Sequence, residues 1–347
     1  MPMIATLGEG NTPLVESNRL AQMLGLRRLL LKLETCNPSG SYKDRFAAAQ
    51  VTEMLRDGAL ACVATSSGNT GSALAAYCAR YGIACAVLVN EHAPAGKLTQ
   101  MQAHGARIYR VKEFATSAAV TESVFARLVA FSNQHGVSLV VSAYRYCPAG
   151  MEGVEPIAQE LWAQSGRRLD HVFVPVGGGG LFSAVCRGFG KIQAGGVKTH
   201  AVQPEGCSTV VAAYERGVDE IEPVESTTRI SGLSVPNDID ASLALRTLRE
   251  CGGMGIAVSD DEVFESQRML LSLEGIYCEP AGATALAGLR KALRLGGVSA
   301  GDTMVCLVTG HGFKDPDSVA KAAEGNPAEA ISHTGVEKAL LELMETR

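Results

Sequence analysis

The chain has 347 residues, a length that predicts about two domains of roughly 150 residues each. Its hydrophobic content of 46% and its 13 prolines exclude an intrinsically disordered chain, and its net charge of −5, from 31 basic and 36 acidic residues, argues against a protein that binds nucleic-acid phosphates. Its 38 glycines exceed the usual level of roughly 7%, so the backbone makes many tight turns or many close approaches to other atoms.

Short apolar segments alternate with amphipathic segments along most of the chain, which predicts an α/β fold with parallel sheets covered by helices on both faces. The expected strands are residues 29–34, 61–66, 83–90, 106–111, 138–143, 171–176, 199–203, 256–258 and 303–309. The expected helices are residues 41–56, 70–81, 97–104, 116–135, 152–165, 182–194, 261–274 and 281–295. Ser41 and Asp260 are the predicted N-caps of two of these helices.

Irregular stretches at residues 92–96 and 144–150 favour an insertion in the middle of the chain. We expect a larger domain of residues 1–45 and 150–323, interrupted by a smaller α/β domain of residues 46–149. Residues 324–347 are predicted to be a helical tail that packs on the body or on a partner subunit.

The ten cysteines form no CxxC pair, and most lie in apolar segments. They are expected to be reduced thiols in the core of a cytoplasmic protein, and no metal site is predicted. The first residues do not form a signal peptide, and the longest uncharged stretch, residues 58–79, is interrupted by polar residues. We therefore expect no membrane span.

Ligands of parallel α/β proteins bind beyond the carboxyl ends of strands, so the loops that follow strands are the candidate site. In the first such loop, Lys43 lies in the first turn of a predicted helix, where the helix dipole disfavours a cation and favours a nucleophilic amine. The alternative is a solvated lysine paired with Asp44.

Two other loops are built from small residues before predicted helices. Ser66, Ser67, Gly68, Asn69 and Thr70 offer hydroxyls and backbone N–H groups to a carboxylate or phosphate, although an ordinary turn is the alternative. The run Gly177, Gly178, Gly179 and Gly180 leaves bare amides that a phosphate could approach closely.

A fourth loop follows the last strand and begins with Thr309, a neutral hydroxyl. His311 in that loop is either catalytic or an ordinary loop residue. Together the loops provide an amine that could form an imine, a carboxylate site and a phosphate site. A phosphorylated aldehyde cofactor that acts on an amino acid would use all three.

Six motifs carry a resemblance to a known family. They are EGNTPL (9–14), NPSGSYKDR (37–45), TSSGNTGSALAAY (65–77), the pattern Lys97-Leu98…Gln100…Gly105-Ala106, EPAGA (279–283) and TGHGFKDP (309–316). Over residues 8–318 the chain resembles the fold-type II pyridoxal-phosphate enzymes, the tryptophan-synthase-β-like superfamily, and within it the threonine synthases most closely. The resemblance implies two three-layer α/β domains with pyridoxal 5'-phosphate in the cleft between them.

The resemblance also implies residue roles. Lys43 would hold the cofactor as an imine and then transfer protons, while Asn69 would contact the ring hydroxyl and Thr309 the ring nitrogen. The cofactor phosphate would bind at Gly177, Gly178, Gly179, Gly180 and Leu181. The substrate would bind at Ser66, Ser67, Gly68, Asn69, Thr70, Lys97 and Arg145.

The expected reaction is elimination or replacement on a small amino acid, threonine synthesis from O-phosphohomoserine and water first of all. The GGGGL loop (177–181) is instead typical of serine and threonine dehydratases, so a dehydratase stays open as an alternative. A paralogue that replaces a β-substituent on phosphoserine, and a non-catalytic binding protein, are further alternatives. The resemblance implies a homodimer, and no nucleic-acid or membrane partner is expected.

Overall fold

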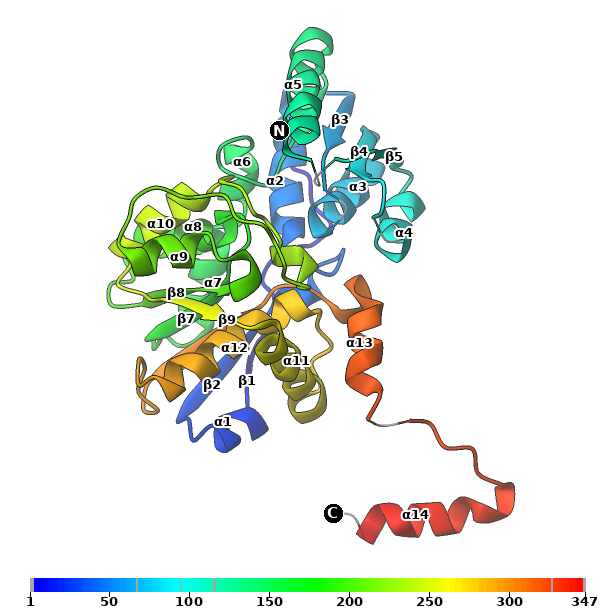
Figure 1. Ribbon diagram of the computed structural model, residues 1–347, viewed down its shortest axis with the longest axis vertical. Helices are drawn as coiled ribbons and strands as arrows, with labels where there is room; N and C mark the ends of the chain where they lie inside the picture. Colours follow the sequence, from blue (N-terminus) through cyan, green and yellow to red (C-terminus); the bar gives the residue numbers. More distant parts are fainter. Residues whose placement is uncertain (1–2, 67, 94, 115–116, 326, 346–347) are drawn as a thin grey trace.

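The computed structural model describes residues 3–66, 68–93, 95–114, 117–325 and 327–345 (Figure 1). It contains two sheets made almost entirely of parallel strands and covered by helices, which confirms the predicted α/β fold. One sheet has six strands and the other four.

The six-stranded sheet has the order β1-β2-β10-β7-β8-β9. Its strands are β1 (Leu14–Glu16), β2 (Arg28–Leu33), β7 (His171–Pro175), β8 (Lys198–Pro204), β9 (Gly255–Val258) and β10 (Thr303–Val308). Every residue of β7 and β10 is buried, as expected for central strands with helices on both faces. The β1–β2 pair at the edge is antiparallel and the other pairs are parallel.

The four-stranded sheet has the order β5-β4-β3-β6 and is parallel throughout. Its strands are β3 (Ala61–Ala64), β4 (Ala84–Asn90), β5 (Arg107–Val111) and β6 (Ser138–Val140). All four fall within residues 46–149, the segment expected to form an inserted domain. The domain boundaries themselves stay a prediction.

The helices connect the strands and cover both sheets (Figure 1). They are α1 (Arg19–Met23), α2 (Lys43–Arg56), α3 (Asn69–Tyr81), α4 (Ala95–Ala103), α5 (Ala118–His135), α6 (Pro148–Glu152), α7 (Pro156–Gln164), α8 (Gly180–Lys191), α9 (Val210–Arg216), α10 (Ala241–Glu250), α11 (Asp260–Glu274), α12 (Pro280–Arg294), α13 (Pro316–Ala323) and α14 (Val336–Glu345). Short 3-10 turns are η1 (Glu34–Cys36), η2 (Glu205–Cys207), η3 (Ser231–Leu233), η4 (Gly312–Lys314) and η5 (His333–Gly335).

Several predicted elements differ in detail. The helix expected at residues 152–165 is α7, which begins only at Pro156, a residue that lacks an N–H and suits the first position of a helix. The separate short helix α6 occupies Pro148–Glu152, mostly before the expected start. The N-cap of α11 is Ser259 rather than Asp260, and its hydroxyl and the Glu262 carboxylate form a capping box. Tyr42, not Ser41, directly precedes α2. The sequence patterns do not predict strand β1 or helices α1, α9, α10 and α13.

The C-terminal tail contains the expected helix, α14, which lies apart from the body at the end of an extended segment (Figure 1). Leu340, Leu341 and Met344 on this helix are exposed. No helix in the described part of the chain is both long and apolar enough to cross a membrane.

A buried network of charged side chains joins four elements near the start of α2. Arg45 donates to Glu34 through Nε and a terminal nitrogen, at 2.8 Å each, and to the two oxygens of Glu160 at 2.6 and 2.8 Å. Lys32 Nζ lies 2.6 Å from Glu160 Oε2 and also donates to the Thr12 carbonyl. The network is neutral and hydrogen-bonded throughout, which is the condition under which buried charges are tolerated. It links β2, η1, α2 and α7.

Removing one carboxylate of this network is expected to destabilise the fold strongly. Glu160→Gln would leave Arg45 and Lys32 with an excess of buried positive charge, so we expect a loss of about 3–5 kcal/mol in the free energy of unfolding at pH 7. Burial opposes ionisation of Glu160, but Arg45 and Lys32 lower its pKa to about 2 from 4.5. Its contribution is therefore present above about pH 4.5 and lost as the pH falls through about 2.

Urea denaturation at several pH values measures this effect, with Glu53→Gln as the matched control. Glu53 pairs with Arg56 at the surface and should change stability by less than about 1 kcal/mol. Equal losses for the two variants, or a Glu160→Gln deficit that does not shrink below pH 4.5, would contradict the assigned role.

Candidate active site

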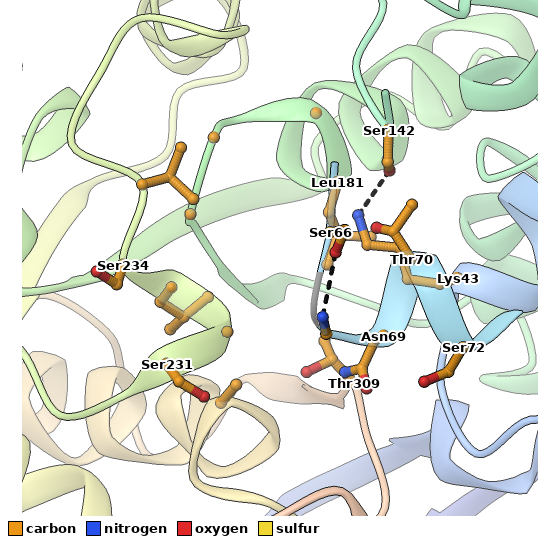
Figure 2. Close-up of a pocket in the computed structure, with 18 of the residues that line it drawn as sticks. Lys43, Ser66, Asn69, Thr70, Ser72, Ser142, Leu181, Ser231, Ser234 and Thr309 are labelled. Carbon is orange, nitrogen blue, oxygen red and sulfur yellow. Dashed lines mark hydrogen bonds between the residues drawn. The ribbon is translucent and has the colours of Figure 1, made fainter. Parts of the chain in front are cut away.

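A cavity of about 450 Å³ lies where the carboxyl ends of strands from the two sheets face each other. Its walls come from the start of α3, the segment after β6, the glycine loop between β7 and α8, η3 and the segment after β10. This is where ligands bind in parallel α/β proteins. Figure 2 shows the side chains that converge there.

Lys43 is the first residue of α2 and points into the cavity (Figure 2). Its Nζ donates to Ser142 Oγ at 2.6 Å and forms no ion pair with any described residue. Asp44 turns the other way, because it accepts from the backbone N–H and the hydroxyl of Ser39 at 2.9 and 2.6 Å. Burial raises the pKa of Asp44 to about 6. The alternative of a solvated Lys43 paired with Asp44 therefore does not describe the structure.

The glycine loop, Gly177 to Gly180, leads directly into α8, so its residues place no side chain over the start of this helix. Gly179 has a φ of +98°, and a Cβ there would lie 2.6 Å from the Asp240 carbonyl oxygen. A Cβ on Gly177 would lie 3.3 Å from the Gly232 carbonyl oxygen. The 12-residue helix that follows has first-turn N–H groups without partners inside the helix. The loop thus leaves room and donors for a phosphate-sized anion.

The loop between β3 and α3 forms a second set of donors. Asn69 and Thr70 begin α3, and Ser66 Oγ accepts from the Gly68 N–H at 3.3 Å. A Cβ on Gly71 would lie 2.3 Å from the Ser66 carbonyl oxygen, so this turn also requires glycine. Asn69 Nδ2 donates to Glu279 Oε1 at 2.7 Å, a bond that joins this loop to the start of α12.

Most residues singled out in the sequence meet at this cavity. It is lined by Lys43, Ser66, Gly68, Asn69, Thr70, Gly177, Gly178, Gly179, Gly180, Leu181 and Thr309. Ser67 and the side chain of Lys97 lie outside the described residues, and the backbone of Lys97 belongs to α4.

Arg145 and His311 are not brought to the cavity. Arg145 is exposed, its guanidinium lies 5.7 Å from the centre of the Tyr146 ring, and its backbone N–H binds Asp240. His311 packs against Tyr277 and Phe313, and its Nδ1 accepts from the Phe313 N–H, as an ordinary loop residue does.

Lys314 is a second lysine at the cavity wall, and no role was expected for it from the sequence. Its Nζ donates to Gln100 Oε1 at 2.6 Å, so it joins η4 to α4, and it forms no ion pair with a described residue. Burial lowers its pKa to about 8, although Glu279 and Asp44 act in the opposite direction. Lys314 is the basic residue of the TGHGFKDP motif (309–316), and this position in a loop that follows a strand is the sequence signal for it.

Asp240 is also a residue whose role the sequence does not predict. Its carboxylate accepts from the backbone N–H groups of Tyr144 and Arg145 at 2.7 and 3.2 Å, and its own N–H donates to the Gly178 carbonyl. It therefore fixes the segment after β6, which carries Ser142, against the glycine loop. Nothing in its local sequence distinguishes it from an ordinary helix N-cap.

Comparison with known proteins agrees with this geometry. Residues 5–310 match the family model described as pyridoxal-phosphate dependent enzyme. The chain is 35% identical over 329 residues to a threonine synthase of Methanocaldococcus jannaschii, covering 92% of this chain and 79% of that protein. It is 31% identical over 331 residues to a threonine synthase of Halalkalibacterium halodurans, covering 94% and 88%.

Solved structures share the fold. A pyridoxal 5'-phosphate-dependent aspartate racemase is 25% identical with a TM-score of 0.74, covering 87% of this chain and 90% of that one. Threonine deaminase isoform 2 from Solanum lycopersicum has a TM-score of 0.78 at 20% identity, covering 91% and 83%.

A side chain added to the glycine loop is expected to weaken binding of the cofactor. Gly179→Ala would add a Cβ at a positive φ and against the Asp240 carbonyl, displacing the amides that face the cavity. Loss of such a charge-assisted hydrogen bond is worth about 1.5–3 kcal/mol, so we expect about 10- to 100-fold weaker binding of pyridoxal phosphate to the apoprotein.

Titration of the apoprotein with pyridoxal phosphate, followed by its absorbance, measures this change. Gly190→Ala on the same helix is the matched control, because a Cβ there meets open space. Unchanged affinity in Gly179→Ala would show that the glycine loop does not bind the cofactor phosphate.

Proposed function

Since the chain belongs to the pyridoxal-phosphate-dependent enzymes, a family that uses pyridoxal phosphate, we propose that it is a carbon–oxygen lyase that converts O-phosphohomoserine and water into threonine and phosphate. Its similarity to threonine synthases over most of both chains supports this reaction. The observation that carries the choice of a phosphorylated substrate is the second lysine of the cavity, Lys314.

The residues present fit the cofactor. The bare N-terminus of α8 with Gly177 to Leu181 would hold its phosphate, Lys43 its aldehyde, Asn69 its ring hydroxyl and Thr309 its ring nitrogen. When bound, pyridoxal phosphate withdraws electrons from the bonds at the substrate Cα and so makes the α-proton removable. Thr309 offers a neutral hydroxyl rather than a carboxylate, which does not enforce a protonated ring and so favours elimination and replacement over transamination.

Lys43 would move the protons. Its Nζ donates to the hydroxyl of Ser142 at 2.6 Å, which orients the amine toward the cavity. Once free of the cofactor, it accepts the α-proton and returns protons to neighbouring carbons. Both steps require Nζ to stay within hydrogen-bond reach of the substrate.

The N-terminus of α3 would bind the substrate carboxylate. Thr70 and Ser66 contribute hydroxyls, and the first N–H groups of a 13-residue helix favour an anion. Glu279 holds the Asn69 amide, which leaves the asparagine in a fixed orientation beside this site.

Lys314 would bind the substrate phosphate. The two helix N-termini would bind the cofactor phosphate and the substrate carboxylate. The half-buried ammonium of Lys314, whose hydrogen-bond partner is the neutral Gln100 amide, is then available to a second phosphate. Serine and threonine carry no such group. This cation therefore favours a phosphorylated substrate over the two amino acids that a dehydratase uses.

A serine or threonine dehydratase is the second candidate, and the GGGGL loop (177–181) favours it. A paralogue that replaces the β-substituent of phosphoserine would use the same groups. A binding protein without activity is less well supported, because nothing in the packing around Lys43 requires an amine at the start of a helix.

Parallel product assays distinguish these candidates. The protein loaded with pyridoxal phosphate is expected to release phosphate and form threonine from O-phosphohomoserine, and Lys43→Ala should lose both this activity and the visible absorbance of lysine-bound cofactor. Keto acid and ammonia from serine or threonine, without phosphate release, would instead establish a dehydratase. A protein that never takes up the cofactor would refute every catalytic candidate.

Substitution of Lys314 tests the phosphate site. Lys314→Met should lower kcat/KM for O-phosphohomoserine by about 10- to 100-fold, the effect of losing one charged hydrogen bond. It should also weaken inhibition by inorganic phosphate. Since the ammonium deprotonates above a pKa of about 8, the KM of the unmodified protein should rise as the pH passes 8.

The matched control is Lys321→Met on α13, which removes an exposed lysine. If phosphate release persists in Lys314→Met with unchanged KM, Lys314 is not the phosphate ligand, while the reaction itself stands.

A further inference from the structure

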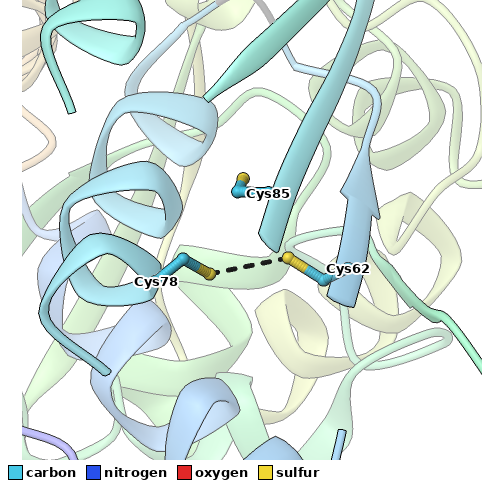
Figure 3. A group of neighbouring side chains, drawn as sticks. All are labelled: Cys62, Cys78 and Cys85. Atoms are coloured by element: carbon cyan, nitrogen blue, oxygen red, sulfur yellow. Dashed lines mark hydrogen bonds between the residues drawn. The ribbon is translucent and has the colours of Figure 1, made fainter. Parts of the chain in front are cut away.

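Three cysteine sulfurs meet in the core of the smaller sheet, outside the cavity described above (Figure 3). The Sγ atoms of Cys62, Cys78 and Cys85 all lie within 4.8 Å of one another, and the first two are 3.5 Å apart. No fourth histidine, cysteine or carboxylate among the described residues lies within that distance of all three.

The topology creates this cluster. Cys62 and Cys85 are register partners on the adjacent parallel strands β3 and β4, and Cys78 comes from α3, which packs on them. The side chains are buried within the apolar core, and Cys85 is the most exposed at 9%. The sequence spacing gave no sign of the cluster, because the three residues share no short motif.

We propose that Cys62, Cys78 and Cys85 form a three-thiol binding site for trivalent arsenic, taken up as arsenite. Thiolates select soft ions, and the site offers three sulfur ligands and nothing else among the described side chains. Trivalent arsenic is pyramidal, and three sulfurs bonded to it at about 2.3 Å lie roughly 3.4 Å apart. The Sγ atoms of Cys62 and Cys78 are already 3.5 Å apart, and Cys85 needs to approach them only from within 4.8 Å.

Charge decides which soft ion the site fits. Each thiol must lose its proton to become a ligand, so the three carry −3. A monovalent ion would leave −2 and a divalent ion −1 in an apolar core, where net charge is strongly disfavoured. A trivalent ion leaves a neutral complex, and trivalent arsenic takes three ligands, whereas a structural zinc site requires four.

The chemical step balances without an oxidant or reductant. One molecule of As(OH)₃ reacts with three thiols, three As–S bonds replace three As–O bonds, and the three thiol protons leave with the hydroxyls as three water molecules. The arsenic stays trivalent. The product crosslinks β3, α3 and β4. Two of these elements, β3 and α3, flank the loop that contains Ser66, and Asn69 and Thr70 are the first residues of α3.

The full-length protein loaded with pyridoxal phosphate is titrated with arsenite and examined by native mass spectrometry, thiol counting and thermal unfolding. We expect one arsenic per chain, the loss of three titratable thiols and a raised Tm, since a ligand of the folded state stabilises it. Zn²⁺ is titrated in parallel and should bind more weakly, because it finds neither a fourth ligand nor charge balance.

Single substitutions then identify the site. Cys85→Ala and Cys78→Ala should each weaken arsenite binding by about tenfold or more. Cys306→Ala, a buried strand thiol, and Cys251→Ala, from the neighbouring pair Cys186 and Cys251, should leave it unchanged.

Each variant is first shown to unfold cooperatively, and Cys85→Ala is the mildest change because Cys85 has the largest exposed fraction of the three, 9%. No arsenic on the folded protein, equal binding in Cys85→Ala, or tighter binding of Zn²⁺ than of arsenite would each overturn the proposal.

Discussion

The buried charge network around Arg45 is the constraint on which the site depends. Arg45 and Lys32 form ion pairs with Glu34 and Glu160. Burying any one of these charges without its partner would be strongly unfavourable. Because Arg45 lies two residues after Lys43, the network fixes the first turn of α2 against β2 and α7. These ionic contacts hold the start of the helix from the side opposite Lys43, whose Nζ forms no ion pair with a described residue and donates to Ser142.

The features predicted well from sequence are those set by local chemistry. Uniformly apolar strands such as 303–308 must be buried on both faces, which fixes a parallel α/β fold. Glycine runs and hydroxyl-rich turns indicate strand ends where the backbone can contact a ligand. Lys43, Asn69, Gly179 and Thr309 were selected from such loops, and all four line one cavity. The roles of these residues, and the domain boundaries, stay predictions.

The features that escaped prediction depend on contacts between distant segments. Lys314 is held at the cavity by a hydrogen bond to Gln100, which lies 214 residues away in sequence. No local pattern reveals this contact. Arg145 was expected at the site on its motif, yet it is exposed and does not line the cavity. The cysteine cluster arises only once β3 and β4 pair and α3 packs on them.

Polar bonds that join the two sides of the cavity include those from Asn69 to Glu279, from Lys314 to Gln100, from Gln100 to the Ser39 carbonyl, and from the N–H groups of Tyr144 and Arg145 to Asp240. Each such bond contributes about 0.5–3 kcal/mol, the upper part of the range applying to charged partners. None of these bonds lies within either sheet, so all of them can break while both sheets stay folded. If substrate enters between the two sides, breaking and re-forming these bonds is part of each catalytic cycle and contributes to its rate.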